Sequence, residues 1–137
     1  MNKNDELIRI ILQHYPATQA IYLFGSFAAG QDWPGSDVDI AILLPPEEAK
    51  KTGSLQMSDL RFDLETLLGK EVDLINLRQA PTVLRKEVVM ADRRIFDRDR
   101  FAAEEFEMLT LSYYQKLNEE RAEILAEARA GKRFHQA

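Results

Sequence analysis

The chain has 137 residues, 45% of them hydrophobic, which is enough for one compact domain with an apolar core. It has no cysteine and only two histidines, His14 and His135, which excludes disulfides and thiolate metal sites and disfavours zinc. A formal net charge of −5 argues against a general nucleic-acid-binding surface. The start, MNKNDELIRI, holds no apolar run long enough for a signal peptide or a membrane span, so we expect a cytoplasmic protein.

Hydrophobic periodicity, with proline and glycine as boundaries, predicts alternating helices and strands. We interpret residues 45–53, PPEEAKKTG, as a polar connection, and we expect Gly69 and Gly131 to end the helices that precede them. In chain order the predicted elements are a helix over 3–15, strands over 20–24 and 37–44, a helix over 57–68, a strand over 71–77, a helix opened by Pro81, a short strand over 94–97 and a long helix over 101–130.

Two short motifs flank the first two predicted strands. Gly25-Ser26 ends the apolar run of the first strand, and Asp37-Val38-Asp39 begins the second. Because side chains alternate along a strand, Asp37 and Asp39 fall on one face. Two carboxylates on one face of an apolar strand repel each other unless a cation lies between them. Such an arrangement suits a hard cation such as magnesium, which also leaves room for phosphate oxygens.

The order Gly-Ser, ten residues, then Asp-x-Asp resembles the signature of the polymerase beta-like nucleotidyltransferases, and most closely their minimal branch. The resemblance covers the chain to about residue 98. It implies an α/β (α+β) fold with a small mixed sheet backed by helices. We therefore expect a single nucleotidyltransferase domain over 1–137, with a core of about 1–98 and a C-terminal helical extension of about 99–131.

The resemblance also implies roles for six residues. Asp37, Asp39 and Asp73 match the acids that hold two magnesium ions and act in catalysis in this family. Gly25 and Ser26 would form the cradle for the triphosphate of ATP, because a glycine at a strand end lets the backbone approach phosphate closely. Ser36 could donate a further hydrogen bond to the nucleotide.

Members of the minimal branch often act as antitoxins. The resemblance implies a protein adenylyltransferase (an AMPylator) that moves AMP from ATP to a tyrosine of a cognate HEPN-domain ribonuclease toxin and so neutralises it. Two alternatives stay open: a binding-only antitoxin with an idle site, and a nucleotidyltransferase acting on a small molecule of the aminoglycoside type. RNA tailing is disfavoured by the charge. Where relatives often carry Arg or Lys, this chain has Ala29, which removes a possible phosphate contact.

Other features have ordinary structural interpretations beside the functional ones. The arginines at 93, 94, 98 and 100 are interleaved with aspartates, which favours a solvated turn and strand edge over a phosphate site. Trp33 is expected to pack on its own domain. Arg61 is not assigned to the site. The aromatic stripe with Phe106 and Tyr113 is equally consistent with core packing and with a partner surface.

Overall fold

The computed structural model describes residues 3–25 and 37–135, with side chains described as far as Ala130. Ser26, Ala29, Trp33 and Ser36 lie outside the described residues, so the expectations for them stay predictions. The elements in chain order are α1 (Lys3–His14), β1 (Ala20–Phe24), β2 (Val38–Leu43), α3 (Pro46–Thr52), α4 (Asp59–Leu68), β3 (Val72–Asn76), a 3-10 turn η1 (Leu77–Gln79), α5 (Thr82–Met90), β4 (Arg94–Asp97) and α6 (Arg100–His135).

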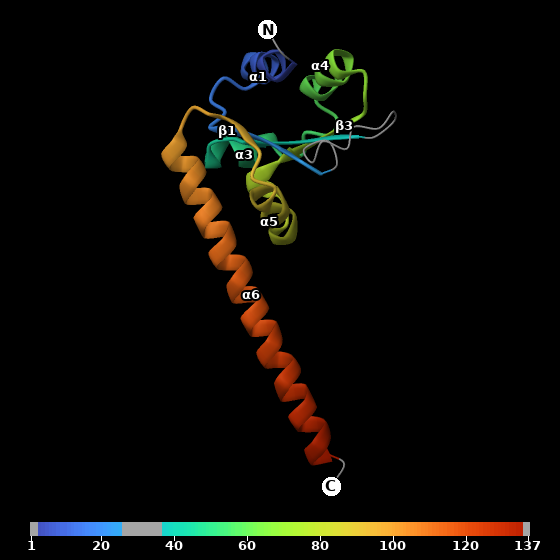
Figure 1. The fold of residues 1–137 in the computed structure, drawn as a ribbon, viewed down its shortest axis with the longest axis vertical. Helices are drawn as coiled ribbons and strands as arrows, with labels where there is room; N and C mark the ends of the chain where they lie inside the picture. Colours follow the sequence, from blue (N-terminus) through green and yellow to red (C-terminus); the bar gives the residue numbers. More distant parts are fainter. Residues whose placement is uncertain (1–2, 26–36, 136–137) are drawn as a thin grey trace.

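Four strands form one mixed sheet in the order β3-β2-β1-β4. The strand β1 pairs antiparallel with β2 and with β4, whereas β2 and β3 run parallel. Helices α1 and α4 lie on one side of the sheet, and α5 and α6 lie on the other, where α6 projects far beyond the body of the molecule (Figure 1). The predicted α/β fold, with a small mixed sheet between helices, is confirmed.

The alternation of side chains along the strands gives the protein two separate cores. Even-numbered residues of β2 join Leu7 and Ile11 of α1 and the leucines of α4 in one apolar cluster. Odd-numbered residues of β2 join Val88 of α5 and Phe106 of α6 in the other. Every residue of β2 is therefore buried except Asp39, which is partly exposed.

The segment 46–52 corrects the sequence interpretation, because it forms helix α3 rather than a polar connection. Pro46 stands in the first turn, where its missing N–H costs nothing, and glutamates and then lysines follow in the order that favours the helix dipole. Ala49 is its buried contact. Asn76 of β3 ties the helix down, since its amide donates to the carbonyl oxygens of Ala49 and Gly53 at 2.9 and 2.8 Å.

The last helix also differs from the prediction, because it continues through Gly131 to His135 instead of ending there. Its first turns pack in the second core through Ala103 and Phe106, whereas Tyr113, Ile124 and Leu125 are exposed. The aromatic stripe is thus core at its start and surface further along. Of the helices described, none is both long and apolar enough to cross a membrane.

A polar contact fixes α6 to the sheet. The hydroxyl of Tyr22 on β1, which is buried, donates to Glu107 Oε2 at 2.8 Å. Arg94 of β4 donates to the same oxygen at 2.5 Å and also pairs with Asp97 at 3.1 Å. Burial and the Glu107 carboxylate raise the pKa of Tyr22 well above its ordinary value. Arg94 is therefore a structural residue here and no part of a phosphate-binding patch.

We expect Glu107→Ala to lower the free energy of unfolding by about 1–3 kcal/mol, because it leaves the buried Tyr22 hydroxyl without an acceptor. The matched control is Glu104→Ala, which removes only the exposed pair with Arg100 and should cost less than about 0.5 kcal/mol. Chemical denaturation measures both. Equal losses in the two variants would contradict this role, as would an undiminished loss when Glu107→Ala is made together with Tyr22→Phe.

Candidate active site

Two carboxylates lie side by side on neighbouring strands. Asp39 of β2 is paired in the parallel ladder with Asp73 of β3. Adjacent strands lie about 4.8 Å apart, and directly paired residues point to the same face, so the two carboxylates share one face of the sheet. That face is the one covered further along by α5 and α6. Both side chains are partly exposed and sit toward the starts of β2 and β3.

Glycine at position 25 is required by the position of Asp39. Phe24, the last residue of β1, is paired with Asp39, so Gly25 lies beside the carboxylate. Gly25 has φ 73°, and a Cβ on it would lie 2.0 Å from Asp39 Oδ2. Only a residue without a side chain permits this approach of the backbone to the carboxylate. Gly25 and the acid on β2 therefore form one unit.

The surroundings of Asp39 disfavour its ionised form. Burial, the Asp73 carboxylate and the Asp37 carboxylate, in that order, raise the pKa of Asp39 above its ordinary value. Desolvation and like charges both disfavour the ionised form. A cation placed between the acids would remove the repulsion and favour ionisation.

The third predicted acid differs from the other two. Asp37 precedes β2 and is exposed, although it is close enough to act on Asp39 electrostatically. Within residues 3–25 and 37–135, no three His, Cys, Asp or Glu side chains are gathered as a ready-made metal site. Of the predicted site residues, the described structure thus brings together Gly25, Asp39 and Asp73, with Asp37 at the margin.

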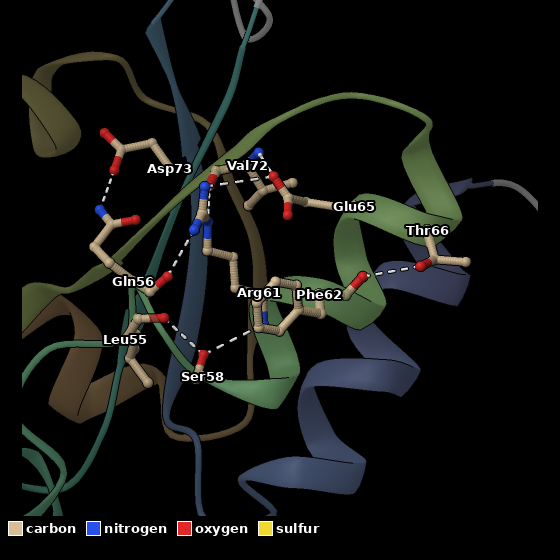
Figure 2. Close-up of polar contacts among 9 residues, drawn as sticks. All are labelled: Leu55, Gln56, Ser58, Arg61, Phe62, Glu65, Thr66, Val72 and Asp73. Atoms are coloured by element: carbon tan, nitrogen blue, oxygen red, sulfur yellow. Dashed lines mark hydrogen bonds and ion pairs between the residues drawn. The ribbon is translucent and has the colours of Figure 1, made fainter.

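Asp73 is held by a residue that the sequence analysis did not find. Gln56, in the segment between α3 and α4, donates through its amide Nε2 to Asp73 Oδ1 (Figure 2). That bond leaves Asp73 Oδ2 for other partners. Nothing in the local sequence marks Gln56 as a contact of Asp73, since it lies 17 positions from that acid.

Arg61 explains why Gln56 is in place. Its Nη1 donates to the carbonyl oxygen of Gln56 and its Nε to that of Val72, each at 2.8 Å. Glu65 in turn accepts from the Val72 N–H at 3.0 Å and pairs with Arg61 at 3.5 Å, as Figure 2 shows. The guanidinium thereby fastens the segment before α4 to the start of β3. Arg61 is a positioning residue and not a free cation for a triphosphate.

Comparisons with known proteins assign the chain to a family. Residues 6–101 match the family described as Polymerase beta, Nucleotidyltransferase. The chain belongs to this family. The matched segment contains both motifs and the acid-bearing strands.

Individual relatives of this nucleotidyltransferase include a protein adenylyltransferase and solved toxin–antitoxin complexes. Protein adenylyltransferase MntA of Shewanella oneidensis is 34% identical over 130 residues, covering 95% of this chain and 89% of that protein. A solved toxin–antitoxin structure with AMP-PNP matches with a TM-score of 0.70 and 31% identity, over 93% of this chain and 98% of that one. The tri-AMPylated HEPN toxin of Shewanella oneidensis in complex with its MNT antitoxin gives a TM-score of 0.64 at 30% identity, over 92% of this chain and 95% of that one.

The donor set fits a hard divalent cation. Asp39 and Asp73 offer oxygen ligands on one face, Asp37 lies at the margin, and Gly25 brings the backbone close to the Asp39 carboxylate. Carboxylate oxygens with open positions for water and phosphate are what magnesium prefers. The repulsion that raises the Asp39 pKa is the force that such an ion would offset.

We expect Gly25→Ala to be more harmful than alanine at other left-handed glycines. Gly69, the left-handed cap of α4, has φ 65° and ψ 25° with open space around an added Cβ, so Gly69→Ala tests the backbone cost alone, about 1 kcal/mol. Gly25→Ala adds a clash with Asp39, typically worth a further 1–3 kcal/mol. Denaturation of both variants measures the difference. The excess should vanish when Gly25→Ala is combined with Asp39→Ala, and its persistence there would contradict the clash.

We expect Asp39→Asn to stabilise the metal-free protein at neutral pH, by less than about 1 kcal/mol because solvent screens a half-exposed group. A raised pKa means that the contribution of Asp39 to stability is full below its unfolded pKa and is lost as pH rises through the folded value. The stabilisation by Asp39→Asn should therefore become smaller as the pH falls toward about 4, where Asp39 itself is increasingly protonated. Melting temperatures in EDTA measure it, with exposed Glu120→Gln as the control. A destabilised Asp39→Asn protein under these conditions would refute the repulsion.

Proposed function

We propose that this chain is the antitoxin of a HEPN/MNT toxin–antitoxin pair and transfers AMP from ATP to a tyrosine of its HEPN ribonuclease toxin. The observation that carries the proposal is the pair Asp39 and Asp73 beside the Gly25 turn. This pair occurs in a chain similar over 95% of its length to a protein adenylyltransferase. The transfer adds a bulky anion to the toxin, which opposes the approach of RNA by sterics and like-charge repulsion.

Each site residue has a role in this proposal. Asp37 and Asp39 would bind two magnesium ions, and Asp73, which is paired with Asp39 on the neighbouring strand, would be a further ligand. Bound metal would activate the attacking oxygen and neutralise the leaving pyrophosphate. Gly25 and Ser26 would hold the triphosphate, with Ser36 as a further donor. Gln56 fixes one oxygen of Asp73 and so aims the other toward the reacting groups.

The proposed reaction is an in-line displacement at the α-phosphorus. The tyrosine oxygen of the toxin forms a bond to the α-phosphorus, and the bond from that phosphorus to the bridging oxygen of the β-phosphate breaks. Pyrophosphate leaves with the electron pair of that bond. Asp73 polarises the tyrosine O–H and accepts its proton. The product carries AMP in a phosphodiester linkage to tyrosine.

A protein partner is supported by the surface of α6. Beyond its first turns the helix exposes Met108, Ile124 and Leu125, each more than half exposed and none of them in a pocket lining. Exposed apolar groups on a projecting helix are typical of a surface that another protein covers. Two solved structures similar to this chain are toxin–antitoxin complexes, and each aligns with more than nine-tenths of it.

We expect the cognate toxin to gain mass in AMP steps when it is incubated with this protein, ATP and magnesium. The double variant Asp37→Asn/Asp39→Asn should lower the rate by at least about 100-fold, because it removes the metal ligands. Asp63→Asn, on α4 at the opposite face, is the control and should retain the rate. Intact-mass spectrometry over time measures all three proteins.

Two results would overturn the proposal. Absence of any mass gain, with toxicity still suppressed by the double variant, would identify a binding-only antitoxin. Modification of a small molecule such as an aminoglycoside by this protein alone would identify a stand-alone enzyme. Magnesium dependence is tested in the same assay by EDTA, which should abolish the mass gain.

A further inference from the structure

A large cavity lies away from the acids, at the other end of the sheet. It has a volume of about 650 Å³, is open to solvent, and is lined by α3, η1, the start of α5 and the first third of α6. Its Arg78 contacts Leu44, directly after β2, whereas Asp39 lies near the start of that strand, so the cavity and the acids lie toward opposite ends of β2. This volume is in the range of sites that hold small molecules.

The charge of the cavity is opposite to that of the protein. Lys50, Arg78 and Arg85 line it, and none of its lining residues is acidic, although the chain as a whole carries −5. The nearest influences of opposite sign on Arg78 are Glu105 and Asp99, and neither lines the cavity. Burial lowers the pKa of Arg78, so an anion in the cavity would meet a poorly hydrated cation.

The two arginines are held in fixed positions. Arg78 donates to the carbonyl oxygen of Leu44 at 2.5 Å and to the side-chain oxygen of Gln19 at 2.6 Å. Arg85 donates to the carbonyl oxygen of Arg78. Both guanidiniums lie over the ring of Phe106, at 5.6 and 5.8 Å from its centre. Arg85 Nε is buried and, within the described residues, has no hydrogen-bond acceptor.

Part of the cavity lining is apolar. Leu109 and Tyr113 of α6 belong to it and are 56% and 55% exposed, so an aromatic ring could pack against them. A lining that holds both cations and an exposed aromatic ring matches a group with a phosphate at one end and a flat base at the other. A lone carboxylate would fill a small part of this volume and leave the apolar part of the lining uncovered.

We propose that this cavity is a second binding site for an adenylyl group, with its phosphate at Lys50, Arg78 and Arg85 and its base against Tyr113 and Leu109. The inference rests on the proposed function, because AMP is the group that the reaction would transfer. The adenylyl group has two possible sources, free AMP in solution or AMP already attached to the toxin. The related Shewanella toxin carries three AMP groups, so attached AMP is present in such a complex.

Binding of AMP to the full-length protein in EDTA tests the site directly, since without metal the acids repel phosphate. Lys50→Glu should weaken AMP binding by about tenfold, as expected for reversing one charge at a phosphate. Lys51→Glu is the matched control, because Lys51 is the next residue of α3 and does not line the cavity. Asp37→Asn/Asp39→Asn should bind AMP at least as tightly as the unaltered protein, because it removes the repulsion between these acids and phosphate and leaves the cavity unchanged. Isothermal titration calorimetry measures all four.

Three outcomes would overturn the site: no saturable AMP binding by the unaltered protein, equal loss in Lys50→Glu and Lys51→Glu, or loss in the aspartate variant. The toxin assay then separates the two sources. A lower ratio of di- to mono-AMPylated toxin with Lys50→Glu identifies attached AMP as the ligand. An unchanged ratio beside weakened AMP binding identifies free nucleotide. Failure of the unaltered protein to modify the toxin would refute the proposed function, while the AMP titration would still decide on the site.

Discussion

The constraint on which this structure depends is the placement of a charged side chain inside an otherwise buried strand. Asp39 interrupts β2, whose other residues are all buried. Desolvation and two neighbouring carboxylates act against its ionised form. The fold accommodates Asp39 because Gly25 has no side chain to collide with its carboxylate and because the acid lies near the start of the strand. The ionised Asp39 therefore lowers the stability of the metal-free protein, and a bound cation would offset that loss.

The surroundings of the acids are arranged to keep them in position. The parallel ladder sets the spacing of Asp39 and Asp73, and it is fixed at both faces by apolar clusters that include helices α4 and α6. Around Asp73, Arg61 fastens the segment that carries Gln56. In these contacts Arg61 and Gln56 hold the backbone and Asp73 in place and do not themselves act as ligands. The acids are therefore positioned by neighbouring residues while remaining partly exposed to solvent.

The sheet carries features of opposite charge at its two ends. Carboxylates gather where β2 and β3 begin, and three cations gather where they end. The long helix α6 lines the cationic cavity through Phe106 and Tyr113, and its later turns expose apolar side chains to solvent. The paired acids and the cationic cavity thus lie in the body of the protein, and the exposed apolar residues of α6 lie on the helix that projects from it in Figure 1.

The sequence by itself determined the strands, most of the helices and the acids, because alternation of apolar and acidic residues and the glycine after β1 are local signals. It also marked the family through Gly25, Asp37 and Asp39. It misjudged helix α3, whose short amphipathic pattern is hidden by prolines and charges, and the end of α6, since one glycine costs a long helix only about 1 kcal/mol. Only the tertiary structure decided that Asp73 pairs with Asp39, that Gln56 holds it, and that Lys50 and Arg85 share a cavity. Those contacts join residues 17 to 35 positions apart, and no local preference encodes such distances.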